Sequence, residues 1–319
     1  MIFDKLFSGE AASIFGIGYA DPITVGLICT GILLILVLSG VRVVFAASLA
    51  GIIGLVELIG VGPALGNIGA IPFSKSVTFV LGLLPIFILI GFLAFQAGMT
   101  KQLFQAAKAW VGFVPGGLAV ATVFATAGFA AVSGASTATA AVFSRVAIPE
   151  MLKEGYDKKL AAGVVAAGGT LASLIPPSAI LIIYAIIVEE SVGALLLAGF
   201  LPGIFSALVY AGIIIIWAKM NPNLAPAIRK YSLKEKIKTL PGVLPIAIVI
   251  SVIISAIYAG WATPTEAGAL GAFVVLIIAV YKGIKIESLK FALVETAKLV
   301  AMIFSIIWGV LIFVRFLGF

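Results

Sequence analysis

The 319-residue chain has no histidine and a single cysteine. Without an imidazole it cannot form a Ser–His dyad, a histidine-ligated haem or a histidine-containing zinc site. Cys29 alone cannot form an internal disulfide, and we expect it to pack as a small apolar residue. Charged residues make up only 10% of the chain, against about 25% in globular domains. These absences leave no nucleophile beside a base, so the sequence predicts no enzyme.

Hydrophobic residues are abundant instead, at 63% of the chain. A soluble fold of this size could not cover so much apolar surface, which predicts an all-α polytopic membrane protein. A crossing needs about 20 mostly apolar residues. We expect residues 1–21 to form a short interfacial helix that ends at the Asp21-Pro22 turn. Eight crossings are then expected, over 22–41, 43–62, 78–97, 158–190, 194–218, 243–260, 264–281 and 296–317.

The basic residues predict the orientation. If the N-terminus lies outside, one face collects seventeen of the 20 basic residues, and the other keeps Lys5, Lys75 and Arg315. By the positive-inside rule the rich face of this multi-pass membrane protein is cytoplasmic. The polar stretch 219–242 is then a cytoplasmic linker. Within it, Ser232 and Glu235 have the spacing of a capping box, which predicts a short basic helix at the membrane surface.

Residues 115–157 do not fit a pair of ordinary crossings. The arm 115–132 could span, but only about ten weakly apolar residues lie between Gly134 and Arg145. The segment between the arms is rich in hydroxyl groups and predicts a re-entrant hairpin with its tip near mid-membrane. Non-helical backbone at that depth must be surrounded by protein or by a water-filled cavity. The alternative is a tightly packed helix pair with small residues at its interface. The candidate tip residues are Ser133, Gly134, Ser136, Thr137 and Thr139.

The next crossing, 158–190, is interrupted in the middle. Glycines precede the interruption and a Pro-Pro pair follows it, which predicts two half-helices joined by open backbone. Freed backbone carbonyls can ligate Na⁺, and the N-terminus of the second half-helix can attract an anion. A merely kinked helix is the alternative. The candidate residues are Gly168, Gly169, Thr170, Ser173, Pro176, Pro177 and Ser178.

A third polar element contains Thr263, Pro264, Thr265 and Glu266. Thr263 suits an N-cap, Pro264 the first helical position, and Glu266 the acid of a capping box. We favour a helix start here over direct contact with a ligand.

The ordered series of these motifs resembles the large membrane subunit of tripartite ATP-independent periplasmic (TRAP) transporters. The series runs from 84–91 through Trp110, 116–117, 133–139, 149–151 and 155–157 to 174–178 and 263–267. The resemblance implies an elevator-type, sodium-driven importer in the inner membrane, which carries an organic anion such as a C4-dicarboxylate or a sialic acid. It also implies a small membrane subunit, a soluble periplasmic binding protein and no cofactor beyond the coupling ion. In that family the hairpin tip and the broken helix form the sodium and substrate site.

The resemblance implies two inverted repeats, each with a hairpin and a broken helix. Here 86–98 is weakly echoed by 303–318, where the chain ends, so we expect an incomplete second repeat and half of the site. The predicted parts are scaffold and arm helices over 1–114, the site-forming part over 115–190, and scaffold helices with the start of the second repeat over 191–319. The alternative function is a non-transporting fragment, or a passive channel or scaffold subunit of the membrane.

Overall fold

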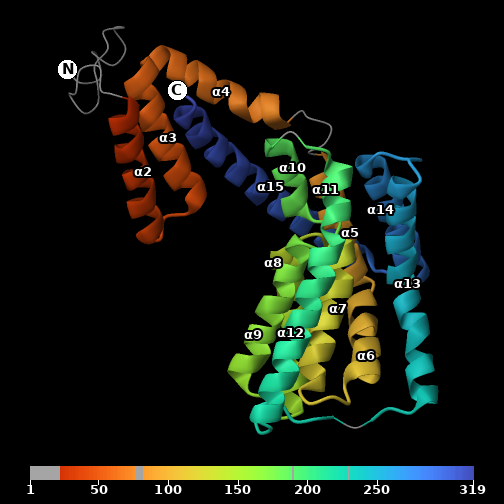
Figure 1. Cartoon of the computed structure of the whole chain (residues 1–319). Coiled ribbons are helices and arrows are strands. Elements are labelled where there is room, and N and C mark those ends of the chain that lie inside the picture. The colour runs from red at the N-terminus through yellow and green to blue at the C-terminus, as the bar shows by residue number, and fades with distance from the viewer. Residues whose placement is uncertain (1–21, 77–81, 189, 229) are drawn as a thin grey trace. The chain divides into compact units, whose positions relative to one another are not determined.

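The computed structural model describes residues 22–76, 82–188, 190–228 and 230–319, and within them the chain is helical with no strand (Figure 1). The interfacial helix expected over 1–21 lies outside the described residues. The helices are α2 (Pro22–Leu38), α3 (Val43–Ile59), α4 (Val61–Ser76), α5 (Leu83–Gln96), α6 (Met99–Val111), α7 (Gly117–Ser133), α8 (Ser136–Lys153), α9 (Lys158–Thr170), α10 (Ala179–Ile187), α11 (Val192–Ala198), α12 (Phe200–Met220), α13 (Leu233–Tyr258), α14 (Pro264–Tyr281) and α15 (Ile286–Leu317).

The chain divides into two compact units. Of the described residues, the smaller unit contains 22–76 and 298–319, and the larger one contains those between 82 and 297. In the smaller unit, α2, α3, α4 and the end of α15 bury an apolar cluster that includes Cys29, Leu55 and Phe316. Cys29 is completely buried, as expected of a small apolar residue. A Cβ atom at Gly51 would lie 2.8 Å from the backbone of Phe313, so glycine lets α3 approach α15 closely there.

The larger unit is built around α7. Fourteen of its 17 residues are buried, and α5, α6, α8, α9 and α12 pack against it. Most of its residues are Ala, Gly, Val or Thr, which allow the neighbouring helices to approach closely. Small residues therefore shape the hairpin interface, as the packed-pair alternative supposed. Helices α7 and α8 form a helical hairpin with only two residues between them. Both alternatives share this arrangement, so re-entry into the membrane stays a prediction.

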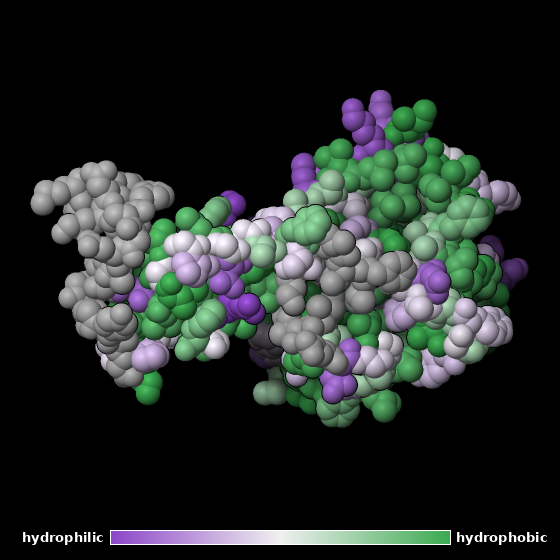
Figure 2. Space-filling view, turned by 90° about the horizontal axis from the view of Figure 1, so that it is seen from above, coloured by the Kyte–Doolittle hydropathy of each residue, from purple (hydrophilic) through white to green (hydrophobic). Residues whose placement is uncertain are grey.

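Each of the eight expected crossings coincides with helix, but some bounds differ. Among the described residues, four helical segments are long and apolar enough to span a membrane by themselves. They are Val192–Met220 (α11 and α12 together), Leu233–Tyr258 (α13), Pro264–Tyr281 (α14) and Ile286–Leu317 (α15). The pair α5 and α6 would make a fifth if it is counted as one span, although it bends by 70° at the Ala97-Gly98 break. Exposed apolar side chains cover the outer helices, for example Leu201 on α12 and Phe273 on α14. Hydrophobic residues likewise predominate on the face shown in Figure 2, as expected of a polytopic helical membrane protein.

In the connecting segments, one helix was not predicted and one expectation was wrong. Helix α4, over 61–76, was not predicted, since its Gly- and Pro-containing sequence resembles a loop. The capping box at Ser232 and Glu235 is formed, but it begins the 26-residue α13 and not a short surface helix. Pro241 and Pro245 lie inside α13 without ending it, as prolines can in transmembrane helices, where local adjustments and neighbouring groups satisfy the freed carbonyls.

Candidate functional site

The hairpin tip is a tight, buried turn. Ser133 ends α7, Gly134 follows with a positive φ of 61°, and the extended Ala135 leads into α8. The hydroxyl groups of Ser133 and Thr139 are hydrogen-bonded at 2.8 Å, and both residues are fully shielded from solvent. The tip therefore places paired hydroxyls and irregular backbone together inside the unit.

In the broken helix, two prolines remove the donors that a continuous helix would need. Pro176 and Pro177 have no N–H for the carbonyl oxygens of Ala172 and Ser173, which lie four residues earlier. The Ser178 hydroxyl donates to the Ser173 carbonyl at 2.9 Å and replaces one of these bonds. Within the described residues, no hydrogen bond reaches the carbonyl of Ala172. A buried carbonyl without a donor is a candidate ligand for a cation.

The two interruptions contact each other directly. The N–H of Ala179, the first residue of α10, donates to the carbonyl of Gly134 at the hairpin tip (2.8 Å). In a continuous helix that N–H would have bonded to the carbonyl of Ile175. A Cβ atom at Gly134 would collide with the carbonyl oxygen of Pro177. The sequence predicted both breaks, and the structure joins them into one polar backbone region.

The predicted residues differ in how they take part in this region. Ser133, Gly134, Thr139 and the three residues from Pro176 to Ser178 are buried there, Ser136 and Ser173 are half-buried, and Thr137 and Thr170 are exposed. Thr170 instead shares a hydrogen bond of 3.2 Å with the Tyr210 hydroxyl on α12.

The two glycines of the broken helix lie in a different conformation from the one expected. We expected open backbone from Gly168 onward, but α9 continues to Thr170 and a short 3₁₀ turn to Ser173, so the open stretch is 174–178. Gly168 and Gly169 serve close packing. A Cβ at Gly168 would lie 2.5 Å from Thr126 Oγ1, and one at Gly169 would lie 2.9 Å from Ala140 Cβ.

The N-terminus of α10 is largely occupied by its own protein contacts. Ser178 is the N-cap, and its hydroxyl accepts from the N–H of Leu181 (3.3 Å) while the N–H of Ala179 bonds to Gly134. Two of the first three amides of α10 are thus already paired. The expected positive end of the helix is present, but few of its donors are free for an anion in this conformation.

The third polar element is a helix start, as we favoured. Thr263 and Glu266 form a complete capping box, with Pro264 at the first helical position of α14. The Glu266 carboxylate accepts from the Thr263 backbone N–H at 2.7 Å and from its hydroxyl at 2.8 Å. Thr265 is half-buried in the same turn. Helix α14 packs mainly against α5 and α13, so these contacts explain the motif without a ligand.

Two contributors to the site were missed by the sequence analysis. Gly91 on α5 faces the hairpin tip, where a Cβ atom would lie 2.8 Å from Ser133 Cβ. Thr126 on α7 is buried beside Gly168 and donates to the Val123 carbonyl at 2.8 Å. The only available signal was a lone glycine in an apolar run and a lone threonine in a small-residue helix, and neither indicates its distant partner.

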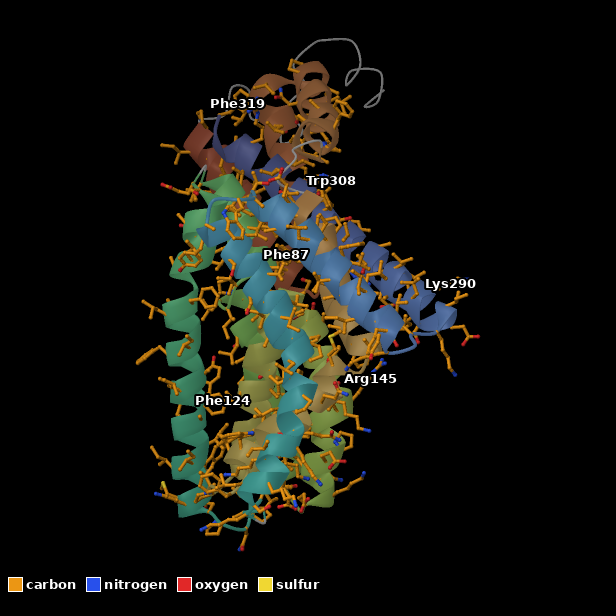
Figure 3. All side chains as sticks on the ribbon, turned by 90° about the vertical axis from the view of Figure 1, so that its right-hand side faces the viewer. Phe87, Phe124, Arg145, Lys290, Trp308 and Phe319 are labelled. Atoms are coloured by element: carbon orange, nitrogen blue, oxygen red, sulfur yellow. The ribbon has the colours of Figure 1, made fainter. Side chains whose placement is uncertain are left out.

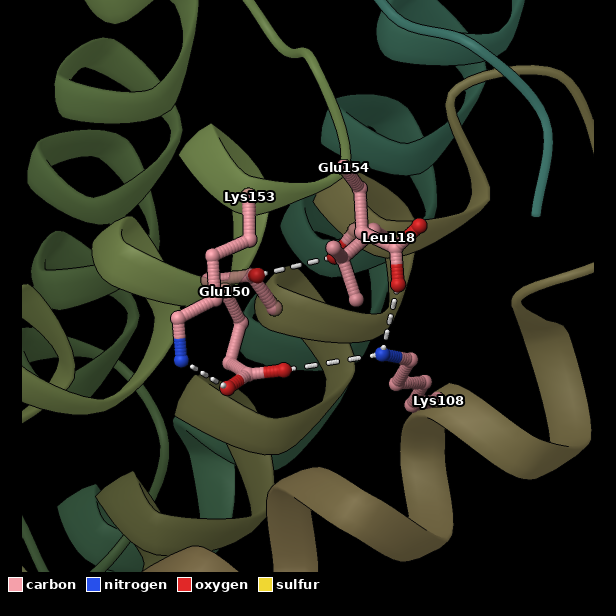
Figure 4. Close-up of polar contacts among 6 residues, drawn as sticks. Lys108, Leu118, Glu150, Lys153 and Glu154 are labelled. Atoms are coloured by element: carbon pink, nitrogen blue, oxygen red, sulfur yellow. Dashed lines mark hydrogen bonds and ion pairs between the residues drawn. The ribbon is translucent and has the colours of Figure 1, made fainter.

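The base of the hairpin is fixed by polar contacts (Figure 4). The Lys108 ammonium on α6 lies 3.2 Å from Glu154 and 3.6 Å from Glu150, and Lys153 lies 3.4 Å from Glu150. The Tyr156 hydroxyl accepts a hydrogen bond from the N–H of Leu118 near the start of α7 (3.1 Å). Burial raises the pKa of this phenol above its ordinary value, so it stays neutral. These contacts connect the C-terminal ends of α6 and α8 to the N-terminal end of α7.

Comparison with known proteins places these features in a family. The sequence model of the tripartite ATP-independent periplasmic transporter, DctM component, matches residues 24–319. A C4-dicarboxylate TRAP transporter large permease protein of Pseudomonas aeruginosa is 36% identical over 247 residues, which are 77% of this chain and 57% of the relative. A protein of the same description from Rhodobacter capsulatus is 32% identical over 90% of this chain and 68% of its own length. The sialic acid TRAP transporter large permease protein of Vibrio cholerae is 30% identical over 74% of this chain and 55% of its own length.

The chain thus spans from somewhat over half to about two thirds of the length of these relatives. The matched region includes the hairpin, the broken helix and the capped start of α14. The chain belongs to the DctM family, the large permease components of tripartite ATP-independent periplasmic transporters.

Proposed function

We propose that this chain forms part of a sodium-coupled transporter that imports an organic anion across the inner membrane. The observation that carries the proposal is the direct contact between the hairpin tip and the broken helix, where the Ala179 N–H bonds to the Gly134 carbonyl. Interrupted helices that meet inside a membrane protein are typical of ion and substrate sites.

In this proposal, Na⁺ is held by backbone carbonyls of the two interruptions. The unpaired Ala172 carbonyl is the first candidate ligand, since Pro176 has deprived it of its helical donor. No group of three or more acidic or thiol side chains that could hold a metal ion occurs among the described residues. A weakly charged, carbonyl-rich site suits a hard monovalent cation that must also be released.

The substrate class is proposed from the relatives. Those matched carry the descriptions C4-dicarboxylate, sialic acid, isethionate and ectoine. All four compounds carry an acidic group, which is a sulfonate in isethionate and a carboxylate in the other three, and the higher identities are among the C4-dicarboxylate permeases. We therefore propose that the substrate is a carboxylate. A periplasmic binding protein delivers it, and this chain transports it in complex with a small membrane subunit.

The test is uptake by proteoliposomes that contain the assembled transporter, with succinate or a sialic acid presented by the binding protein. We expect saturable uptake that needs an inward Na⁺ gradient and stops when K⁺ replaces Na⁺. Downhill flux that is indifferent to Na⁺ would instead support the passive channel and would contradict the proposal.

A further inference from the structure

A cavity of about 680 Å³ lies away from the two helix interruptions, between α6, α8 and the start of α13. Its lining includes four basic residues and two acidic ones, namely Lys101, Lys108, Arg145, Lys153, Glu150 and Glu235. The residues that form the proposed transport site do not line it. The function of this cavity therefore needs a separate explanation.

The charges of the cavity are only partly compensated. Lys108 and Lys153 form ion pairs with Glu150, and Lys108 also pairs with Glu154. The Glu235 carboxylate accepts from the Ser232 N–H at 2.8 Å in the helix cap. Lys101 and Arg145 form no ion pair with any described residue. Arg145, labelled in Figure 3, projects from α8.

A second cavity, of about 380 Å³, continues the basic surface along α6 and α13. The two cavities share Gln105 and Thr239, and the second adds Lys238 and Lys282. The described residues that line it include no acid. We call the surface formed by Lys101, Arg145, Lys238 and Lys282 the basic groove. Its charge is complementary to an anion that can contact both cavities.

Aromatic side chains near the basic groove indicate at which level of the bilayer the groove lies. The Lys236 ammonium lies 5.7 Å from the ring centre of Trp110 and 5.0 Å from that of Phe113. Both rings are more than 40% exposed. Exposed tryptophan beside lysine is typical of the headgroup level of a bilayer. Ile237 and Leu240 on α13 are also exposed and present apolar surface next to the charges.

We propose that the basic groove binds the phosphate headgroup of an anionic phospholipid, whose acyl chains lie along the exposed apolar residues of α13. A lipid fits better than a free anion because the groove combines uncompensated cations with interfacial aromatics and exposed aliphatic side chains. Basic pockets between transmembrane helices bind lipid headgroups in the same way. This binding does not depend on the transport function proposed above.

The test is native mass spectrometry of the full chain in neutral detergent, titrated with phosphatidylglycerol or phosphatidylcholine. We expect the wild type to bind phosphatidylglycerol in preference. The double variant Lys101→Gln/Arg145→Gln should lose about 30-fold in affinity, because each basic residue near an anionic lipid contributes roughly a factor of five. The matched control is Lys285→Gln/Lys290→Gln, which removes the same charge from exposed positions outside both cavities (Lys290 is labelled in Figure 3).

An equal loss in the control, or equal binding of phosphatidylcholine, would overturn the proposal. Inorganic phosphate provides the third arm of the experiment. If it displaces phosphatidylglycerol at millimolar concentration, and does so only when Lys101 and Arg145 are present, the groove is a site for a soluble anion and the lipid assignment is wrong. Thermal unfolding of each variant shows whether any loss comes from misfolding.

Discussion

Gly134 is required at the hairpin tip for two reasons, its backbone conformation and its close contact with the broken helix. Its φ of 61° is a left-handed conformation, which an L-residue adopts at a cost of about 1–2 kcal/mol. The same residue has no room for a Cβ atom because the Pro177 carbonyl occupies that position. Backbone strain and contact with the broken helix thus both require glycine.

Comparing alanine variants of Gly134 and Gly98 separates the effect of backbone strain from that of the contact with Pro177. Gly98 also has a positive φ, of 73°, but a Cβ atom there would contact nothing within 4 Å. We expect Gly134→Ala to lower the thermal unfolding midpoint more than Gly98→Ala, because it also disturbs the Ala179–Gly134 hydrogen bond. Thermal denaturation of both variants in the same detergent measures the difference. Equal losses would mean that the tip does not pack on Pro177.

Single residues were predictable from sequence where their chemistry is local. The hydroxyls of 133–139 and the Pro176-Pro177 pair indicated the two interruptions, because prolines lack a donor wherever they occur. The packing roles of Gly91, Gly168 and Gly169 were not predictable, since the atoms that exclude a Cβ lie on other helices. A sequence pattern does not specify which helix packs against each of these glycines.

The helices were predictable in type and less so in length. Long apolar runs gave the eight predicted helical regions, while α4 and the first turns of α15 were missed. The capping box at Ser232 predicted the start of α13 but not its length. These segments contain glycine, proline or charged residues, whose local preference is overridden by tertiary packing or by interfacial surroundings. The bend between α5 and α6 was likewise missed, although Gly98 lies at it.

The ion pairs of Lys108 connect α6 to the end of the hairpin. The Lys108 side chain is only 16% exposed, whereas that of Lys153 is 73% exposed. We expect Lys108→Gln to reduce the free energy of unfolding by about 1 kcal/mol at low salt, and less at high salt where charges are screened. Lys153→Gln should change it by less than about 0.5 kcal/mol. Denaturant unfolding at two salt concentrations tests this, and a larger effect at Lys153 would contradict the account.

The hairpin is expected to enter and leave the membrane on the same side. Single cysteines in a Cys29→Ala background can be probed with a membrane-impermeant maleimide, using the exposed Thr137 for the tip and the exposed Trp261 as an outside reference. We expect Trp261→Cys to react from outside and Thr137→Cys to be protected there. Reaction of Thr137→Cys at the rate of Trp261→Cys would favour two full crossings.

At the scale of the whole molecule, the chain combines a small unit with a larger unit that contains the entire candidate site. The predicted three-part division of the chain stays a prediction, as does the sidedness derived from its charges. Membership of the DctM family supports the sequence-based resemblance. The relatives are longer than this chain, so complete transport activity is a property to be tested in the assembled transporter.

The most direct test of the central claim is the Na⁺ dependence of uptake in Gly169→Ala, compared with Gly163→Ala. Both glycines lie on α9, but a Cβ at Gly169 would press on Ala140 and the Ser136 carbonyl at the hairpin tip, while one at Gly163 would meet nothing within 4 Å. If the tip and the broken helix form the sodium site, Gly169→Ala should raise the Na⁺ concentration for half-maximal uptake about fivefold, as expected for overpacking of about 1 kcal/mol. Gly163→Ala should match the wild type. An unchanged Na⁺ dependence in Gly169→Ala, or the same shift in both variants, would contradict the assignment.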